Sequence, residues 1–211
     1  MAREGKVYVF DHPLIQHKIS MLRKVQTSTK DFHALVREIT LLIGYEATRN
    51  LPLESERIRT PLMEMDGPVV NQKVCIVPIL RAGLGMVDAM RDLLPASCVG
   101  HIGLFRDPET KKPVEYYCKV PPDIAHQAVI ILDPMLATGG SAAAAATCLK
   151  KRGAKDITMI NVLGAPEGAA YFSAAHPDVN VYLGCMDQGL NSDCYILPGL
   201  GDAGDRLFGT L

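Results

Sequence analysis

Tryptophan is absent from the sequence, and aromatic residues make up only 6% of its 211 residues. Long apolar runs are absent too, since no stretch approaches the roughly 18 residues needed to cross a bilayer. Residues 1–6 lack the apolar segment of a signal peptide. We therefore expect a soluble, cytoplasmic protein of one ordinary-sized domain, without a membrane partner.

An excess of charge of one sign is also missing, because 22 Lys and Arg residues balance 23 Asp and Glu residues. General nucleic-acid-binding surfaces carry a basic excess that neutralises phosphates. The net charge of −1 therefore predicts no nucleic-acid partner. A local basic pocket for a single phosphorylated ligand is compatible with the same balance.

The six cysteines lack the spacing of a metal or disulfide framework. None forms a Cys-x-x-Cys pair, and the six histidines are not clustered. Cys75, Cys98 and Cys185 lie in apolar segments, which predicts small buried residues in a reducing compartment. Neither a zinc site nor disulfides are expected. His176 ends a predicted helix, where a positive charge would suit the helix dipole.

The segment 129–141 carries the strongest pattern. Residues 129–132 are four consecutive branched apolar residues, which predicts a central strand of a parallel sheet, buried on both faces. Asp133 and Pro134 follow where this strand should end, and residues 138–141 form a Gly-rich turn before an alanine-rich helix. In open α/β sheets ligands bind at the carboxyl ends of strands. A helix N-terminus there binds phosphate through free amides and its dipole.

No Lys follows these glycines, so the loop is not a Walker A motif, and it lacks the G-x-G-x-x-G spacing. An acidic residue ahead of a phosphate loop suits a hydroxylated group beside the phosphate, such as a ribose. From these residues alone, an ordinary strand–turn–helix unit with glycine for packing explains the pattern equally well.

The remaining chain predicts an alternation of strands and helices. Expected strands cover residues 74–80, 98–105, 157–163 and 179–185, and expected helices cover residues 13–24, 30–50, 86–93, 142–149 and 166–176. Residues 54–70 mix charge, Pro and Gly and predict a hairpin outside the sheet. Pro78 lies within the first core strand, where it requires an edge position or a bulge.

Three segments after strand ends are candidates for ligand binding. Residues 81–85 combine Arg81 with two glycines, which lets backbone amides approach an anion. Arg106 ends the 98–105 strand and precedes residues 107–125, a long polar segment with four prolines that is typical of a lid or a disordered connector. Residues 188–211 lose all periodicity and contain five glycines. Because residues 195–198 are too apolar for a frayed end, we expect a binding loop that recognises its ligand through the backbone.

Four motifs resemble those of the type I phosphoribosyltransferase family, and of its uracil phosphoribosyltransferase branch over nearly the whole chain. They are residues 133–141 (DPMLATGGS), 78–85 (PILRAGLG), 187–191 (DQGLN) and 195–210 (YILPGLGDAGDRLFGT). Relatives that act on other bases share the first motif, so the last motif is the one that distinguishes the uracil-specific branch from them. Pro134 departs from the wider pattern, in which many relatives carry a second acid, but uracil-specific members share it.

This resemblance implies an α/β, type I phosphoribosyltransferase fold: a mostly parallel sheet flanked by helices, with N-terminal helices and a C-terminal hood over the base site. A single domain would span residues 1–211, with hood elements at about 51–72 and 186–211. The implied enzyme transfers the 5-phosphoribosyl group from phosphoribosyl diphosphate (PRPP) to uracil, giving UMP and diphosphate, with Mg²⁺ as cofactor. The implied assembly is a homo-oligomer, a dimer or tetramer, and GTP is a candidate effector.

The resemblance also assigns roles by position. The implied catalytic residues are Asp133, Arg106 and Asp202. The implied PRPP-binding residues are Arg81, Arg106, Asp133, Pro134, Met135, Leu136, Ala137, Thr138, Gly139, Gly140, Ser141 and Asp202. The implied uracil-binding residues are Ile196, Gly201, Asp202 and Ala203. PRPP would carry most of the Mg²⁺ coordination, with Asp202 as the one candidate protein ligand, and the Arg81–Ala82 peptide bond is expected to be cis.

Two other functions stay open at this point. A phosphoribosyltransferase for a purine or another pyrimidine should differ in residues 195–206. A non-catalytic regulator on the same fold, binding nucleotides and RNA, should carry a basic face, which the near-neutral net charge does not favour.

Overall fold

The computed structural model describes residues 4–106 and 113–210, except for the side chain of Arg106. Its centre is a nine-stranded sheet with the order β1-β11-β10-β8-β4-β6-β7, to which the short strands β5 and β9 are added beside β4 and β10. These strands are β1 (Val7–Val9), β4 (Val74–Leu80), β5 (Cys98–Val99), β6 (His101–Arg106), β7 (Pro113–Lys119), β8 (Ala128–Leu132), β9 (Met135–Leu136), β10 (Asp156–Gly164) and β11 (Asn180–Met186). All pairs in this sheet are parallel except β6 with β7.

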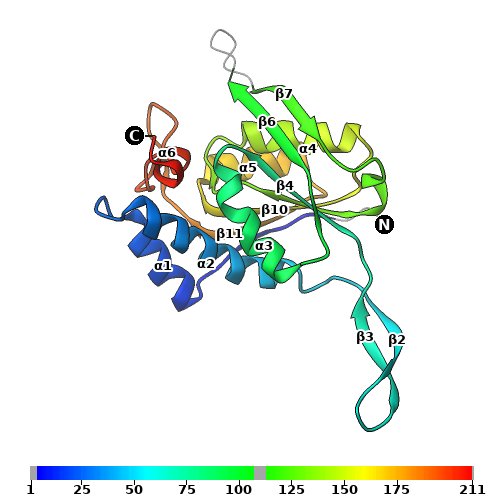
Figure 1. Ribbon diagram of the computed structural model, residues 1–211. Coiled ribbons are helices and arrows are strands. Elements are labelled where there is room, and N and C mark those ends of the chain that lie inside the picture. Colours follow the sequence, from blue (N-terminus) through cyan, green and yellow to red (C-terminus); the bar gives the residue numbers. More distant parts are fainter. Residues whose placement is uncertain (1–3, 107–112, 211) are drawn as a thin grey trace.

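Helices cover both faces of the sheet (Figure 1), as the sequence predicts. One face packs against α1 (Pro13–Arg23), α2 (Thr29–Ala47) and α3 (Val87–Leu93), and the other against α4 (Gly140–Lys151) and α5 (Pro166–Ala175). Strand β8 shows why its sequence does not alternate. Ile130 and Leu132 face the first helix layer while Val129 and Ile131 face the second, so every side chain is buried.

The helix boundaries follow local chemistry. Pro13 occupies the first turn of α1, where its missing amide hydrogen costs no helical bond. The Ser28 hydroxyl accepts a hydrogen bond from the amide of Asp31 at 3.1 Å and caps α2. His176 follows α5, but the prediction of a positive charge there is wrong. Burial lowers the pKa of His176, whose Nε2 lies 3.0 Å from the Ala143 carbonyl oxygen.

Pro78 does not lie on an edge strand, because β4 has neighbours on both sides. On one side, Pro78 pairs with Leu132 of β8 in the register of the sheet. On the other side, β4 pairs with β5 at Cys75 and Ile76, and pairing resumes with β6 only at Ile79. The strand therefore accommodates a residue without an amide hydrogen at a break between two short neighbours, which is the irregularity the proline required.

Two segments outside the core differ in how far they follow the sequence. Strands β2 (Leu53–Arg59) and β3 (Glu64–Val70) form the separate hairpin that the sequence predicts, and it projects away from the C-terminal segment (Figure 1). The assignment of residues 51–72 to a hood stays a prediction. The irregular loop expected over residues 107–125 is wrong for residues 113–119, whereas a lid role for this segment stays a prediction. Strand β7 joins the sheet edge antiparallel to β6, a short 3-10 helix covers Ile124–His126, and residues 107–112 lie outside the described residues.

The C-terminal segment is more regular than its glycines suggest. Strands β12 (Gly189–Leu190) and β13 (Ile196–Leu197) pair with each other, and helix α6 (Ala203–Phe208) follows. Leu207 and Ala203 are buried in the core on the α1–α2 side of the sheet, where Figure 1 shows α6. Among the described residues, no helix is long and apolar enough to cross a membrane.

Candidate active site

The phosphate loop lies at the carboxyl end of β8, as predicted. Asp133 follows the strand, and α4 begins at Gly140. Gly139 precedes the helix with φ 76°, and a Cβ there would lie 2.5 Å from the Gly168 carbonyl oxygen. Only glycine suits this conformation and this close approach. The loop surrounds a hollow of about 100 Å³ lined by Asp133, Met135, Leu136, Ala137, Thr138, Gly139, Ser141 and Ala142.

The loop is held to the sheet by its own backbone. The Pro134 carbonyl accepts hydrogen bonds from the amides of Val162 and Leu163 at 3.0 and 2.9 Å. The Asn161 side chain donates to the Asp133 carbonyl at 2.7 Å. These bonds to β10 leave the α4 N-terminus pointing at the hollow with its amide donors, which is the arrangement that holds a phosphate.

Asp133 is half-buried where the phosphate loop follows β8. Burial raises its pKa to about 7, and the Met135 amide, which donates to Oδ1 at 3.4 Å, lowers the pKa by a smaller amount. Near neutral pH the carboxyl group is thus divided between its two protonation states. A ligand that donates hydroxyl groups or brings positive charge favours the ionised state.

Arg81 lies at the end of β4, beside Asp133. A cis peptide bond is present here, but it joins Leu80 to Arg81, one residue before the expected Arg81–Ala82 bond. Arg81 and Asp133 line a second hollow of about 240 Å³. The other residues that line it are Ile79, Leu80, Ala82, Leu104, Ser141, Asp202 and Gly204. The Arg81 side chain is 57% exposed, and its Nη2 lies 3.1 Å from Asp205 Oδ1. Arg106 ends β6, and its side chain lies outside the described part of the chain.

The C-terminal segment forms a third hollow of about 360 Å³, lined by Arg23, Val25, Pro198, Gly199, Leu200, Gly201, Asp202 and Arg206. Of the predicted uracil-binding residues, Gly201 and Asp202 line it, whereas Ile196 and Ala203 are buried in the core beside it. Asp202 caps α6, because its Oδ1 accepts from the amide of Asp205 at 2.9 Å.

The three hollows form one row. Asp133 and Ser141 line both the first and the second, and Asp202 lines both the second and the third. The fold therefore brings the described residues of the predicted phosphate, diphosphate and base sites together in one continuous row.

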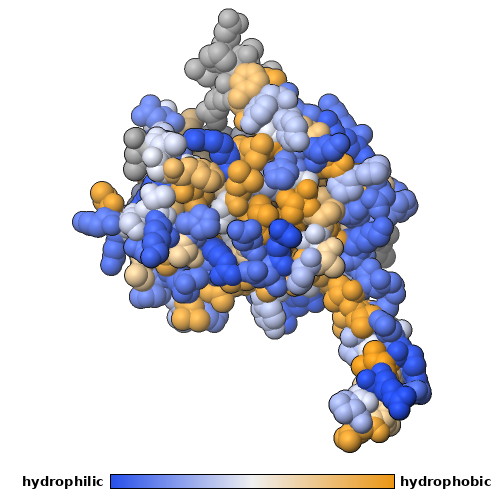
Figure 2. All heavy atoms as spheres, in the orientation of Figure 1, coloured by the Kyte–Doolittle hydropathy of each residue, from blue (hydrophilic) through white to orange (hydrophobic). Residues whose placement is uncertain are grey.

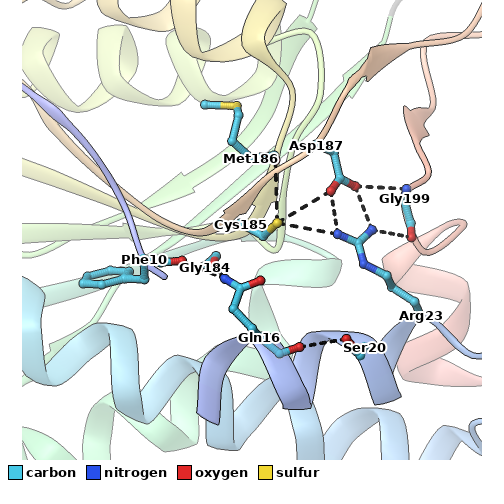
Figure 3. A network of polar contacts seen from close by, with 9 residues as sticks. All are labelled: Phe10, Gln16, Ser20, Arg23, Gly184, Cys185, Met186, Asp187 and Gly199. Atoms are coloured by element: carbon cyan, nitrogen blue, oxygen red, sulfur yellow. Dashed lines mark hydrogen bonds and ion pairs between the residues drawn. The ribbon is translucent and has the colours of Figure 1, made fainter. Parts of the chain in front are cut away.

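Sequence reasoning missed the ion pair that holds the base end together. Arg23, the last residue of α1, lies with Nη2 2.5 Å from Asp187 Oδ1, and its Nη1 donates to the Gly199 carbonyl at 2.8 Å. The Gly199 amide in turn donates to Asp187 Oδ2 at 3.0 Å. Figure 3 shows the guanidinium between the carboxylate and the Gly199 backbone. Asp187 belongs to a motif singled out in the sequence, but nothing in the sequence pairs it with Arg23.

A second missed residue, Arg206, holds the same segment from the other side. Its Nη1 donates to the carbonyls of Leu22 and Leu200, both at 2.9 Å, and its Nη2 donates to the Lys24 carbonyl at 2.6 Å. The guanidinium also lies over the Phe32 ring, 4.5 Å from its centroid. Both arginines therefore fasten the C-terminal segment to the α1–α2 region.

The fold is that of the type I phosphoribosyltransferases. A hypoxanthine phosphoribosyltransferase from Staphylococcus aureus, only 12% identical, has the same fold with a TM-score of 0.51 over 81% of each chain. The AQ2163 protein of Aquifex aeolicus is more similar, with a TM-score of 0.92 and 34% identity over 96% of this chain and 98% of that one.

The sequence comparisons narrow the class. The uracil phosphoribosyltransferase family model matches residues 9–210. Uracil phosphoribosyltransferases from Thermoanaerobacter sp. (strain X514) and Brevibacillus brevis are 58% and 56% identical, over 97% and 98% of this chain and 98% and 99% of their own. The chain belongs to the uracil phosphoribosyltransferase family. This membership confirms the predicted family, fold and enzyme class.

Proposed function

We propose that this chain transfers the 5-phosphoribosyl group from PRPP to uracil, giving UMP and diphosphate, in pyrimidine salvage. The observation that carries the proposal is the row of three hollows joined through Asp133, Ser141 and Asp202. A phosphoribosyl group extends along such a row with its phosphate at the α4 N-terminus, its ribose beside Asp133 and its C1 atom toward the C-terminal segment.

Residues 137–141 hold the 5-phosphate in this proposal, mainly through backbone amides and the Thr138 and Ser141 hydroxyls. Asp133 accepts hydrogen bonds from the ribose hydroxyls, and Arg81 and Arg106 bind the diphosphate. For Arg81 this requires the side chain to exchange Asp205 for the diphosphate. An exposed ion pair is weak enough for such an exchange.

Uracil binds against Gly201, Asp202 and Ala203, with Ile196 beneath them in the core. The base offers alternating N–H and C=O groups, which backbone amides and carbonyls in this segment can match. A buried backbone group left without its partner costs free energy, so an analogue that lacks the matching group is rejected.

The chemistry asks for positioning and charge stabilisation rather than for a nucleophilic side chain. The bond between C1 of the ribose and the diphosphate oxygen breaks, and its electrons leave with the diphosphate as C1 becomes positively charged. The site must neutralise the leaving group, keep both substrates aligned and exclude water. The ionised form of Asp133, on the ribose, adds a negative charge near that centre.

Magnesium fits the donors present at the central hollow. Asp133 and Asp202 both line it, and carboxylate oxygens are hard ligands of the kind that Mg²⁺ prefers. When bound, the ion would offset the charge of the diphosphate. Since Mg²⁺ is usually held by one or two carboxylates plus substrate phosphates, we assign most of its coordination to PRPP, with Asp202 as the candidate protein ligand.

Association into a dimer or tetramer and activation by GTP complete the proposal. Exposed apolar residues support association. They lie on β1, an edge strand, and on the hairpin, and include Val9, Leu53, Leu62 and Met63. Figure 2 shows apolar surface on the projecting hairpin.

GTP activation rests on the family resemblance alone. Light scattering tests the assembly, and turnover with and without GTP tests the effector.

The activity is tested by incubating the protein with radiolabelled uracil, PRPP and Mg²⁺ and measuring labelled UMP. Hypoxanthine and cytosine serve as competing bases under the same conditions. We expect UMP from uracil and no product from the other two. Turnover of hypoxanthine instead would overturn the base assignment, and RNA binding without any turnover would favour the non-catalytic regulator.

A further inference from the structure

Glu115, Cys118 and Cys148 bring three metal-ligating atoms together on the α4 face of the sheet. One ligand atom from each residue lies within 4.8 Å of the other two, and the Cys118 and Cys148 sulfur atoms are 3.5 Å apart. None of these residues lines the three hollows of the substrate site. The cluster is therefore separate from the proposed reaction.

A β-bulge creates the cluster. In the antiparallel pair of β6 and β7, Ile102 pairs with Cys118 and Leu104 pairs with Glu115, so two steps along β6 correspond to three steps along β7. The extra residue is Tyr116, which shares the opposite face with Gly103 and covers it with its ring. Without the bulge, residues 115 and 118 would point to opposite faces. With it, both side chains face α4, which carries Cys148.

The ligand types favour a thiophilic divalent cation. Two sulfur atoms and one carboxylate oxygen are ligands of Zn²⁺ and Cd²⁺, with water at a fourth position. A zinc–sulfur bond of about 2.3 Å places two tetrahedral sulfur ligands about 3.8 Å apart, close to the observed separation of 3.5 Å. Cys148 is buried, whereas Glu115 is exposed and leaves the cluster open to solvent on one side.

Arg152 provides the matching counter-charge. Its Nη2 lies 2.6 Å from Glu115 Oε1, and its Nη1 lies 2.8 Å from the Cys148 sulfur. Two thiolates, one carboxylate and a divalent cation leave one negative charge, which the guanidinium neutralises from the second coordination shell. Because the side chain is 36% exposed, Arg152 can turn outward as the ion enters.

We propose that Glu115, Cys118 and Cys148 bind one thiophilic divalent cation, which ties β7 to the helix that presents the phosphate loop. Binding releases the two thiol protons to solvent as two metal–sulfur bonds form, and no electron transfer is involved. The sequence predicts no zinc site because the ligands have no common spacing. The bulge and the packing of α4 on β7 bring them together only in the fold.

The test uses the reduced, metal-free full-length protein titrated with Cd²⁺. We expect an ultraviolet sulfur-to-cadmium charge-transfer band that saturates at one ion per chain, and a thermal midpoint that rises with Cd²⁺ concentration. Cys118→Ser and Cys148→Ser should each remove most of the band. Glu115→Gln changes an exposed side chain and should keep the fold, while weakening Cd²⁺ binding roughly tenfold, as measured by calorimetry.

Cys194→Ser is the matched control, since Cys194 is exposed and lies outside the cluster. It should bind Cd²⁺ as the native protein does. The absence of a saturating band in the native protein would overturn the proposal, as would a band that survives both Cys118→Ser and Cys148→Ser. Loss of two thiols to oxidised glutathione, with no Cd²⁺ band in the reduced protein, would assign the pair to disulfide formation instead and also overturn it.

Discussion

The phosphate loop at residues 133–141 and the proposed base-binding segment at residues 187–206 lie at the two ends of one row of hollows, yet different contacts hold them. Backbone bonds to the neighbouring strand β10 fix the loop, and its glycines allow the close approaches. The base end depends on side chains from α1 and α6, above all the contact of Arg23 with Asp187, 164 residues apart.

This difference separates two kinds of vulnerability. Damage to the phosphate loop should act on PRPP through local backbone geometry and leave the remaining fold stable. Damage to the base end should act on uracil and on stability together, because the same ion pair is buried and orients the Gly199 backbone. Four substitutions test this comparison, taken from the largest expected effect to the smallest.

Arg23→Met removes the cation from a nearly buried carboxylate, since only 3% of the Asp187 side chain is exposed. We expect the free energy of unfolding to fall by roughly 3–5 kcal/mol, because an unpaired buried charge remains. The KM for uracil should rise more than that for PRPP. Urea unfolding and steady-state kinetics measure the two effects.

The double variant Arg23→Met with Asp187→Leu should regain much of that stability but not the affinity for uracil, because the Gly199 backbone stays without its partners. Arg49→Met serves as the control, since Arg49 lies just after α2 and forms an exposed pair with Glu46. If Arg23→Met and Arg49→Met changed stability and the KM for uracil by the same amounts, the proposed base site would not depend on the ion pair.

Gly139→Ala places a methyl group 2.5 Å from the Gly168 carbonyl oxygen at a backbone φ of 76°. The loop must shift, so we expect kcat/KM for PRPP to fall by about 100-fold. Gly140→Ala is the matched neighbour, because its new Cβ would meet nothing closer than 3.6 Å. In Gly140→Ala we expect kcat/KM for PRPP to fall only a few-fold. Equal losses in the two variants would mean that the loop conformation does not matter.

Asp133→Asn links stability to pH. Because the folded protein raises the pKa of this carboxyl from 3.8 to about 7, the folded state binds the proton more tightly than the unfolded state does. Stability of the ligand-free protein therefore falls as pH rises between these values, and the carboxyl contributes no further change above them. Asp133→Asn has no carboxyl group at this position, so its stability does not fall in this way as pH rises. Above pH 7 it should be more stable than the native protein by roughly 1–3 kcal/mol.

The same variant should have a much lower turnover, since the amide cannot supply the negative charge beside the ribose. Thermal midpoints at pH 5 and pH 8, compared between the native protein and Asp133→Asn, measure the stability effect. A midpoint difference that stays constant between these pH values would argue against a desolvated carboxyl group.

Arg81→Ala should weaken PRPP binding about tenfold through the loss of charge-assisted hydrogen bonds. Stability should hardly change, because Arg81 is mostly exposed and its pair with Asp205 is screened by solvent. Arg57→Ala, in the projecting hairpin, is the control for removing one exposed arginine. An unchanged KM for PRPP in Arg81→Ala would remove this residue from the site.

Local sequence predicted the phosphate loop well because its determinants are contiguous. The apolar run before Asp133, the turn glycines and the alanine-rich helix each favour one conformation without help from distant residues. The same reasoning failed for residues 113–119, where a proline, exposed charges and the bulge at Tyr116 hide the alternation of a strand. It also missed α6, whose six residues are stabilised by the Asp202 cap and the burial of Leu207 rather than by a periodic pattern.

The sequence by itself determined the core strands and helices, the conformation of the loop at residues 133–141 and the family, since these depend on residue types within short windows. The tertiary structure alone decided which distant side chains meet: Arg23 with Asp187, Arg206 with the α1–α2 connection, and Glu115 and Cys118 with Cys148. Such contacts depend on strand order, helix packing and a one-residue change of register. The spacing of residues along the chain therefore does not predict them.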